Sequence, residues 1–372
     1  MKLRIVAVVA GALLLALGLA YLFRGNRTAE MGIAPGTAEQ AFVRETPEVE
    51  VGSHTEKLMM LTATNGTPPP VSITNWLLCL LTNGGEMPRL SREVIDRWLA
   101  SGHTNAEDLL AARQAGGDLE FLRMALTKFP NDPRVLFAAS ALDDASEERR
   151  ARLDRFQATA PDNALADYLS ARDHLKGGRA EAGLADLLAA SGKKGFQDYM
   201  LDAVQNAEEL YLQAGKSPAE AKALAATSAV LPHLAQLKSL AQEMAVLQRQ
   251  YLAAGDTASA ERLAQMGVQL GRQLLEGEGS RTLINQLVGI SVQRIVLNPL
   301  DAEKNYDFLQ GSARDQIAQL DARRAGVRES TKLLDAWMRS ASEADLISYF
   351  DRFKIYGESG ALAWLRQRQG PQ

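Results

Sequence analysis

The residues capable of acid–base or metal chemistry are spread along this 372-residue chain without a spacing that an active site requires. The four histidines, His54, His103, His174 and His233, do not lie at the separations typical of metal ligands. The chain contains no HExxH helix, no phosphate-binding glycine loop and no nucleophile elbow. The sequence therefore predicts no metal site, no cofactor and no catalytic residue.

Local groups of ionisable or glycine-rich residues have both a catalytic and a structural interpretation. Asp173 precedes His174, and such a pair could act as a general base. A surface histidine on a helix explains the same pair without any reaction, and we favour it. Residues 143–152 place four carboxylates beside three arginines, a pattern typical of a solvated helix start. Residues 276–279 are glycine-rich but lack a lysine, which indicates a helix stop.

The first 27 residues indicate targeting to a membrane. Residues 5–23 carry no charge, and basic residues flank them on both sides. Nineteen helical residues rise about 28 Å, which matches the hydrocarbon core of a bilayer. We predict a single-pass signal anchor over residues 1–27 in a bacterial-type inner membrane, with the bulk of the chain periplasmic. A cleaved signal peptide followed by secretion is the alternative.

Residues 28–74 are predicted to be a disordered tether between the membrane segment and a folded body. The stretch is rich in Pro, Gly and Thr, and it ends near the triple proline at residues 68–70. Such a composition buries too little apolar surface to offset the entropy of ordering the chain. A plain spacer is the favoured interpretation, and a docking segment for a proline-binding partner is the alternative. Cys79 is the single cysteine, so no internal disulfide forms, and its apolar neighbours indicate a buried thiol.

The composition of the remaining chain is that of a folded domain that does not bind nucleic acid. Apolar residues make up 46% and charged residues 23% of the sequence, and the formal net charge is −4. A negative chain has no electrostatic field to hold phosphates. Helical periodicity continues from about residue 75 to the end, with no convincing strand. We predict an all-α fold, with a helical body over residues 75–310 and a long helix followed by capping helices over residues 311–372.

Several helix boundaries can be predicted from local chemistry. Thr104 and Glu107 form a candidate capping box, as do Ser217 and Glu220, with a proline in the first helical position of the second. Pro232 should kink or split the helical stretch around it. Residues 280–297 are apolar, but their amides and an arginine indicate a helix buried in the body and not a membrane span.

Residues 163–190 resemble a tetratricopeptide repeat. The positions that carry this resemblance are Tyr168, Ala171, Leu175, Gly178, Gly183, Leu187 and Ala190. Residues 247–267 match a second time, and residues 125–133 match in part. The resemblance implies degenerate helical hairpins stacked into a curved solenoid. Gly178 and Gly255 are 77 residues apart, which is not a multiple of the family period of about 34, so generic helical packing is the alternative.

The same resemblance implies a concave groove lined by the first helix of each pair. The matching positions are Tyr168, Arg172, Lys176 and Arg249, and the two arginines occupy the same family position. Two guanidinium groups on one groove would favour an acidic or carboxylate-ended peptide. Ordinary solvated arginines are the alternative.

These observations together predict a membrane-tethered extracytoplasmic scaffold or adaptor that binds a protein or an acidic peptide. Two other classes stay open. A self-assembling structural protein would use the apolar and aromatic face between Leu346 and Trp364 to bind a second copy. The alternative interpretation is that this face belongs to the hydrophobic core. An enzyme built on a helical toroid would draw its acidic site from dispersed residues.

Overall fold

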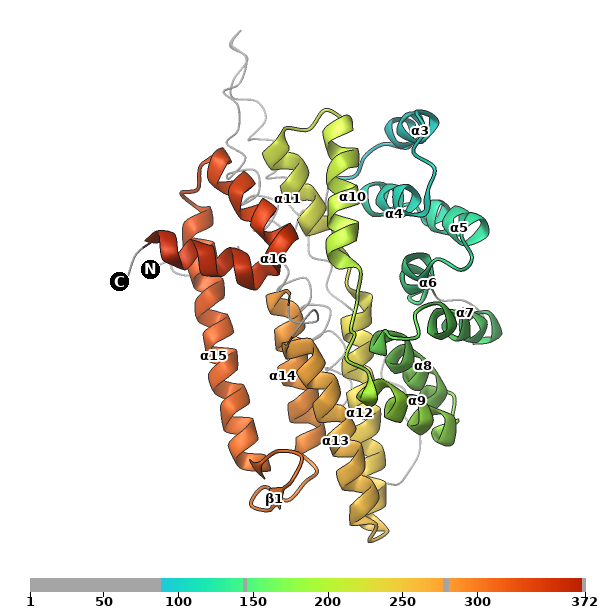
Figure 1. Ribbon diagram of the computed structural model, residues 1–372, viewed down its shortest axis with the longest axis vertical. Coiled ribbons are helices and arrows are strands. Elements are labelled where there is room, and N and C mark those ends of the chain that lie inside the picture. Colours follow the sequence, from blue (N-terminus) through green and yellow to red (C-terminus); the bar gives the residue numbers. More distant parts are fainter. Residues whose placement is uncertain (1–87, 143–145, 277–280, 370–372) are drawn as a thin grey trace, which may run out of the picture.

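The computed structural model describes residues 88–142, 146–276 and 281–369, and this part of the chain is almost entirely helical (Figure 1). The predicted all-α class is therefore confirmed. The predicted membrane segment, the tether and Cys79 lie outside the described residues. Within the described ranges, no helix has the length and apolar character needed to cross a bilayer.

The first half of the described chain forms a column of short helices along one side of the molecule (Figure 1). Each helix follows its neighbour after a short connection, as expected for helical hairpins. These helices are α3 (Arg92–Ala100), α4 (Ala106–Gly116), α5 (Leu119–Lys128), α6 (Pro133–Ala139), α7 (Ser146–Thr159), α8 (Ala164–Lys176) and α9 (Ala180–Gly192).

The second half of the chain returns along this column as longer helices. Figure 1 shows α10 beside α4 and the pair α12–α13 beside α8 and α9, and the tertiary contacts agree. The helices are α10 (Met200–Gln213), α11 (Pro218–Ser228), α12 (Pro232–Ala253), α13 (Thr257–Leu275), α14 (Leu283–Leu297), α15 (Ala313–Met338) and α16 (Glu343–Gln369).

A small β-ribbon, which the sequence did not indicate, lies between α14 and α15. Strands β1 (Asn305–Tyr306) and β2 (Gly311–Ser312) pair antiparallel, with Asn305 opposite Ser312. Gln310 has a φ of 59°, a left-handed conformation that suits a tight connection. Two residues per strand are too few for a periodic pattern, which explains why the sequence did not reveal them.

Most helix boundaries follow the predicted local chemistry. Ser217 and Glu220 form the expected capping box, and Pro218 opens α11. Pro232 splits the stretch, since α11 ends at Ser228 and α12 begins at the proline. Gly357 breaks α16 with a φ of 72°.

The predicted capping box at Thr104 and Glu107 is wrong by one residue. Asn105 caps α4 instead, and its side chain accepts a hydrogen bond from the backbone N–H of Asp108 at 2.8 Å. The Asp108 carboxylate accepts in return from the Asn105 N–H at 3.0 Å. Thr and Asn are both good cap residues, so a pair one step apart is ambiguous in the sequence.

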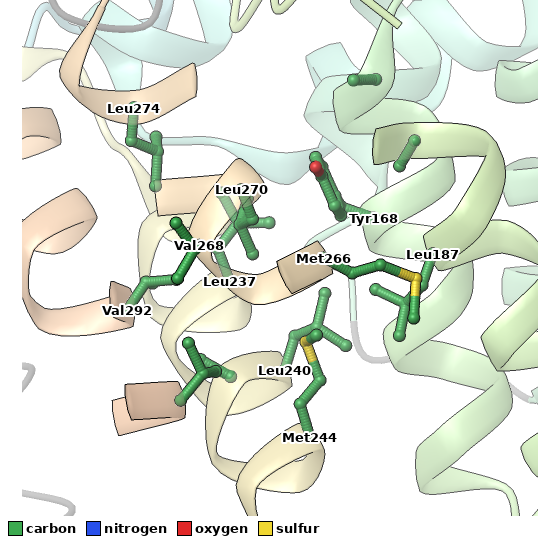
Figure 2. Packing of buried hydrophobic residues seen from close by; sticks show 14 of the residues in the cluster. Tyr168, Leu187, Leu237, Leu240, Met244, Met266, Val268, Leu270, Leu274 and Val292 are labelled. Atoms are coloured by element: carbon green, nitrogen blue, oxygen red, sulfur yellow. The ribbon is translucent and has the colours of Figure 1, made fainter. Parts of the chain in front are cut away.

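The interior consists of two hydrophobic clusters that meet at the partly buried Leu231 and Leu287. The first joins α3–α5 to α10, α11 and α16. The second joins α7–α9 to α12, α13 and α14, and Figure 2 shows Tyr168 and Leu187 packed toward Met266. Residues of α15 enter both clusters, so the core continues across residue 310.

The α8–α9 hairpin has the close packing that its small residues predicted. Gly178 in the turn has a φ of 73°, a conformation that suits glycine. A Cβ atom on Gly183 would lie 2.7 Å from the side chain of Leu175 and 3.2 Å from the carbonyl oxygen of Ala171. A larger residue at position 183 would therefore push the two helices apart.

Helices α13 and α14 approach even more closely, at a seam of glycines. A Cβ on Gly289 would lie 2.7 Å from the carbonyl oxygen of Gly271, and a Cβ on Gly267 would lie 2.6 Å from Val296. Gln248 of α12 lies at the same junction, fully buried, and donates to the carbonyl oxygens of Ala260 and Val296 at 3.3 and 3.1 Å. These hydrogen bonds explain how a glutamine is accommodated at this buried junction.

The aromatic face near the carboxy terminus is mainly core. Tyr349, Phe350 and Phe353 are buried against α10, α11 and α15. The rings of Trp337 and Trp364 meet edge to face, with centroids 6.4 Å apart. Ile355 and Tyr356 point outward and are each 66% exposed, so they are the part of this face that stays accessible.

A buried carboxyl group joins α16 to the start of α14. The Glu358 side chain is 4% exposed and accepts a hydrogen bond from the backbone N–H of Leu283 at 2.7 Å. Gly357 packs against Arg281 so closely that a Cβ would lie 2.7 Å from the Arg281 carbonyl oxygen. Burial raises the pKa of Glu358 to about 7, and the hydrogen bond from Leu283 opposes this shift only in part.

We expect Gly289→Ala to destabilise the fold and Gly326→Ala to stabilise it. The first methyl group meets the backbone of α13, whereas nothing lies within 4 Å of the second, in the middle of α15. Overpacking should cost about 2 kcal/mol at position 289. The better helix propensity of alanine should add about 0.5–1 kcal/mol at position 326. Urea unfolding followed by circular dichroism measures the free energy of unfolding of both variants. Equal effects of the two substitutions would contradict the close approach of α13 and α14 at Gly289.

We expect Glu358→Gln to raise the free energy of unfolding at pH 8 and to change it little at pH 4. The folded pKa of Glu358 lies above its ordinary value, so the carboxyl destabilises the fold as pH rises from about 4.5 through 7. The full difference in the free energy of unfolding is about 3 kcal/mol, because the pKa rises from 4.5 to about 7 and one pKa unit corresponds to 1.36 kcal/mol. Glutamine keeps the acceptor for Leu283. Urea unfolding at both pH values is the measurement, with the exposed Glu343→Gln as control, and a pH-independent effect would refute the assignment.

Candidate functional site

The structure places Tyr168, the first of the four predicted groove residues, in the core. Its side chain is fully buried, and its hydroxyl donates to Oε1 of Gln273 in α13 at 2.8 Å. Burial raises the pKa of this hydroxyl far above its usual range, so it stays protonated. Helix α12 covers the face of α8 that would have lined an open groove, and Gln273 of α13 closes it over the Tyr168 hydroxyl.

The other three predicted residues, Arg172, Lys176 and Arg249, lie nearer the surface on α8 and α12. Lys176 and Arg249 are exposed, and Arg172 is half-buried. Burial raises the pKa of Glu243 on α12, and the positive charges of Arg172 and Lys176 oppose this shift. The structure therefore brings Arg172 and Lys176 together around Glu243. Within the described ranges, no hydrogen bond or ion pair joins Arg249 to them.

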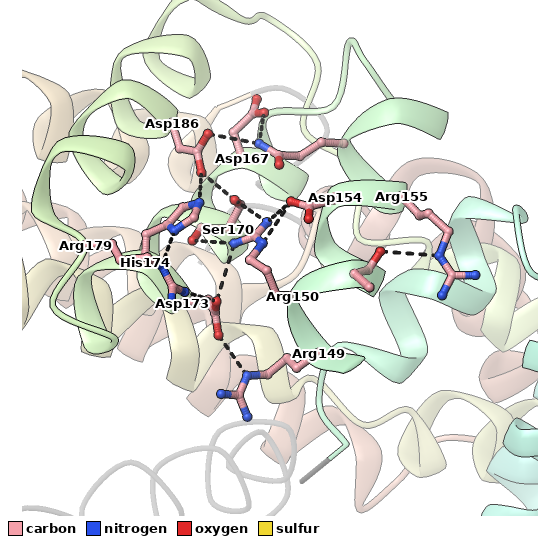
Figure 3. Close-up of polar contacts among 12 residues, drawn as sticks. Arg149, Arg150, Asp154, Arg155, Asp167, Ser170, Asp173, His174, Arg179 and Asp186 are labelled. Carbon is pink, nitrogen blue, oxygen red and sulfur yellow. Dashed lines mark hydrogen bonds and ion pairs between the residues drawn. The ribbon is translucent and has the colours of Figure 1, made fainter. Parts of the chain in front are cut away.

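A dense polar cluster connects α7, α8 and α9 around Asp173 (Figure 3). The Asp173 carboxylate accepts from Arg149 Nε at 2.8 Å, from Arg150 Nη1 at 3.4 Å and from Arg179 Nη2 at 2.9 Å. Its side chain is 9% exposed. The arginines expected to belong to a solvated helix start thus reach across to α8, and the structure corrects that expectation. The carboxylates at 143 and 144 lie outside the described residues.

His174 lies beside a serine and an aspartate, but the three do not form a catalytic triad. Ser170 Oγ donates directly to Asp186, and His174 Nε2 lies 3.7 Å from the same carboxylate (Figure 3). Arg179 Nε donates to His174 Nδ1 at 2.8 Å. Burial and the charge of Arg150 lower the pKa of His174, so the ring is neutral at pH 7. A nucleophile must be hydrogen-bonded to its base and reachable by substrate, whereas Ser170 is bonded to Asp186 and fully buried.

A second buried pair, Asp198 and His233, also has a structural role. His233 is fully buried, and its Nε2 lies 3.5 Å from Asp198 Oδ2. Burial raises the pKa of Asp198, but hydrogen bonds from His233, Met200 and Asn285 outweigh it and hold the pKa below its usual value. The pair joins the loop before α10 to α12 and α14. No group of three or more His, Cys, Asp or Glu side chains that could hold a metal occurs in the described part of the chain.

A further candidate site is an open trough over α13. It has a volume of about 260 Å³ and is bounded on one side by α9 and on the other by the β-ribbon loop. Among the described residues, no carboxylate lines it. The lining residues are Leu188, Ser191, Arg262, Gln265, Met266, Val268, Gln269, Arg272 and Phe308.

The residues that form the floor of this trough could have been predicted from the sequence, but the residues that form its walls could not. Arg262, Gln265, Gln269 and Arg272 are separated by three, four and three residues, which places them on one face of a helix. That spacing is a signal that the sequence analysis missed. Leu188 and Phe308 come from segments about 75 and 45 residues away, and packing alone brings them to α13.

Comparison with known proteins assigns no relationship to this chain: no family model matches it, and no curated protein or solved structure is detectably similar. The functional argument therefore depends on the geometry described above.

We expect Asp173→Asn to lower the free energy of unfolding by about 3 kcal/mol, because it leaves three guanidinium groups around a neutral side chain. Asp154→Asn is the matched control, since Asp154 also binds Arg150, at 2.8 Å, but is 61% exposed. The control should change stability by less than about 1 kcal/mol. Urea unfolding measures both, and similar losses in the two variants would show that burial of Asp173 does not matter.

Proposed function

We propose that this protein is a membrane-tethered extracytoplasmic scaffold that binds an acidic protein or peptide partner. Its body would be a set of degenerate, tetratricopeptide-like helical hairpins held away from the bilayer by the segment at residues 28–74. Residues 5–23 would attach it to the membrane. The mechanism is binding and positioning, without any covalent step.

The observation that carries this proposal is the contrast between two sets of charges. The Asp173 carboxylate is buried and three arginines from neighbouring segments satisfy it, so this cluster holds helices together. The trough over α13 is lined by the exposed Arg262 and the half-buried Arg272, and none of the described residues that line it is a carboxylate. A surface that keeps cations without internal counter-charges is suited to an acidic ligand.

The exposed cations of α8 and α12 add a second positive region. Lys176 and Arg249 are exposed, although the burial of Tyr168 closes the groove in which they were expected to lie. They remain available to a partner that covers the edge of the α8–α12 pair. The buried core beneath both regions would keep the binding surface rigid, which lowers the entropy cost of association.

The proposal predicts a stable protein neighbour whose binding depends on salt. An ascorbate peroxidase fused to the carboxy terminus of the full-length chain, supplied with biotin-phenol and hydrogen peroxide, would label neighbours in the native membrane. At least one labelled protein should then bind the purified full-length chain reversibly and without chemical change. Its affinity should fall severalfold between about 50 and about 300 mM NaCl, because salt screens charge pairs at a surface.

Charge reversal tests the second positive region in the same assay. Lys176→Glu with Arg249→Glu should weaken capture severalfold, while Arg328→Glu with Lys332→Glu on α15 should leave it unchanged. All four residues are exposed, so helicity by circular dichroism should be the same in both variants. If no labelled neighbour rebinds the purified chain, or if a bound molecule is chemically converted, the scaffold proposal is wrong.

A further inference from the structure

The exposed face of α13 carries a regular polar stripe with an arginine at each end. Arg262, Gln265, Gln269 and Arg272 all line the trough. Ten residues separate the two arginines, which corresponds to about 15 Å along a helix axis. The stripe is therefore an elongated surface with two cationic ends and amide groups between them.

The two guanidinium groups keep donors for a ligand. Arg272 donates one N–H to the carbonyl oxygen of Phe308 at 3.0 Å, which orients the group and leaves its other N–H groups unused in the described part of the chain. Arg262 is exposed and makes no hydrogen bond or ion pair within the described ranges. It has a longer-range electrostatic interaction with Asp256. Glu261, its neighbour, is paired with Lys304 at 2.5 Å. Asp256 caps the start of α13, where it accepts a hydrogen bond from the Ser259 N–H at 3.0 Å.

The walls of the trough supply apolar surface beside these donors. Leu188 of α9 is 64% exposed, which is unusual for a leucine on a well-packed helix. Phe308 is half-buried at the opposite side, and Met266 forms part of the floor. A volume of about 260 Å³ is smaller than the 300–1,000 Å³ of typical small-molecule sites. The shape suits a chain lying along the surface better than an enclosed cofactor.

We propose that this trough binds an extended peptide segment that carries two carboxylates about five residues apart, with an apolar residue between them. An extended chain advances about 3.3 Å per residue, so four or five residues span the distance between the arginines. The carboxylates pair with Arg262 and Arg272, and the apolar side chain contacts Leu188 and Phe308. The amides of Gln265 and Gln269 hydrogen-bond to the peptide backbone. This assignment rests on the proposed scaffold function and names its ligand and its site.

A nucleic acid is a poorer occupant of the same cations. Two arginines neutralise few phosphates, and the formal net charge of the chain is −4. The apolar walls also offer no stack of aromatic rings for bases. A single-stranded oligonucleotide therefore belongs in the test as a competitor that should not bind.

The test uses the full-length chain in lipid nanodiscs and a fluorescein-labelled peptide, Gly-Glu-Thr-Leu-Thr-Ser-Glu-Gly, followed by fluorescence anisotropy. We expect saturable binding that weakens with added salt. A peptide with both Glu replaced by Gln, and one with the two Glu placed side by side, should each bind at least fivefold more weakly. A single-stranded oligonucleotide should not displace the labelled peptide.

Variants of the protein then locate the site. Arg262→Gln with Arg272→Gln should weaken binding about tenfold, and Leu188→Asp, at an exposed position, should weaken it by a similar factor. Arg328→Gln with Lys332→Gln removes the same charge outside the trough and should have no effect. Circular dichroism checks that each variant is folded. Equal binding by the trough and control variants, or no preference for the spaced diglutamate peptide, overturns the assignment.

The outcomes also separate this inference from the scaffold proposal. If a membrane neighbour rebinds the chain and the trough variants capture it normally, the scaffold proposal stands and the trough assignment is wrong. If the peptide binds in the trough but no neighbour rebinds, the trough assignment stands and the scaffold proposal is wrong.

Discussion

The buried Gln273 side chain connects α13 to the α8–α9 hairpin and so links the two halves of this protein. The Gln273 carboxamide accepts from the Tyr168 hydroxyl at 2.8 Å and donates to the Lys193 carbonyl oxygen at 2.7 Å. A buried polar group without a partner is costly, so these bonds define one register of α13 against the α8–α9 hairpin. A shift of one residue would turn α13 by about 100° and leave the hydroxyl and the amide unsatisfied.

In this register, each face of α13 lies against a different environment. Leu263, Leu270 and Leu274 face the core, and Gly267 and Gly271 face α14, where small residues permit the close approach. The remaining face carries Arg262 and Arg272 toward solvent. The trough is therefore a direct consequence of the packing, since the helix has no other face left for its polar residues. Within the described ranges, later helices of the chain fill the space around Tyr168, where the groove was expected.

Several buried charges in the described helices stabilise contacts between different helices. Asp173 joins α7 to α8, and Lys222 binds Glu208 at 2.7 Å and Asp351 at 2.5 Å, which connects α11 to α10 and α16. Each of these groups has its counter-charge within hydrogen-bond distance. Such pairs add little net stability over apolar packing, but the loss of one partner leaves an uncompensated charge. They thus favour one arrangement of helices, which is what a rigid binding surface needs.

Local chemistry in the sequence was sufficient for the helical class and for most helix boundaries. Ser217, Pro218, Pro232 and Gly357 act through atoms within about one turn of helix, so their effects could be predicted without knowing any distant neighbour. The Gly183 contact was predictable for the same reason, since its hairpin is continuous in the chain. At the start of α4 two adjacent cap residues competed, and the prediction was wrong by one position.

Tertiary structure decided which of the candidate residues reach solvent. Tyr168 meets Gln273 from 105 positions away, and no pattern within α8 reveals that a later helix covers it. In the same way, Arg150 donates a hydrogen bond to Asp173 of another helix, and Leu188 and Phe308, from distant segments, line the same trough. Helical periodicity shows which residues share a face, but it does not show what that face meets, because burial depends on the packing of segments that are distant along the chain.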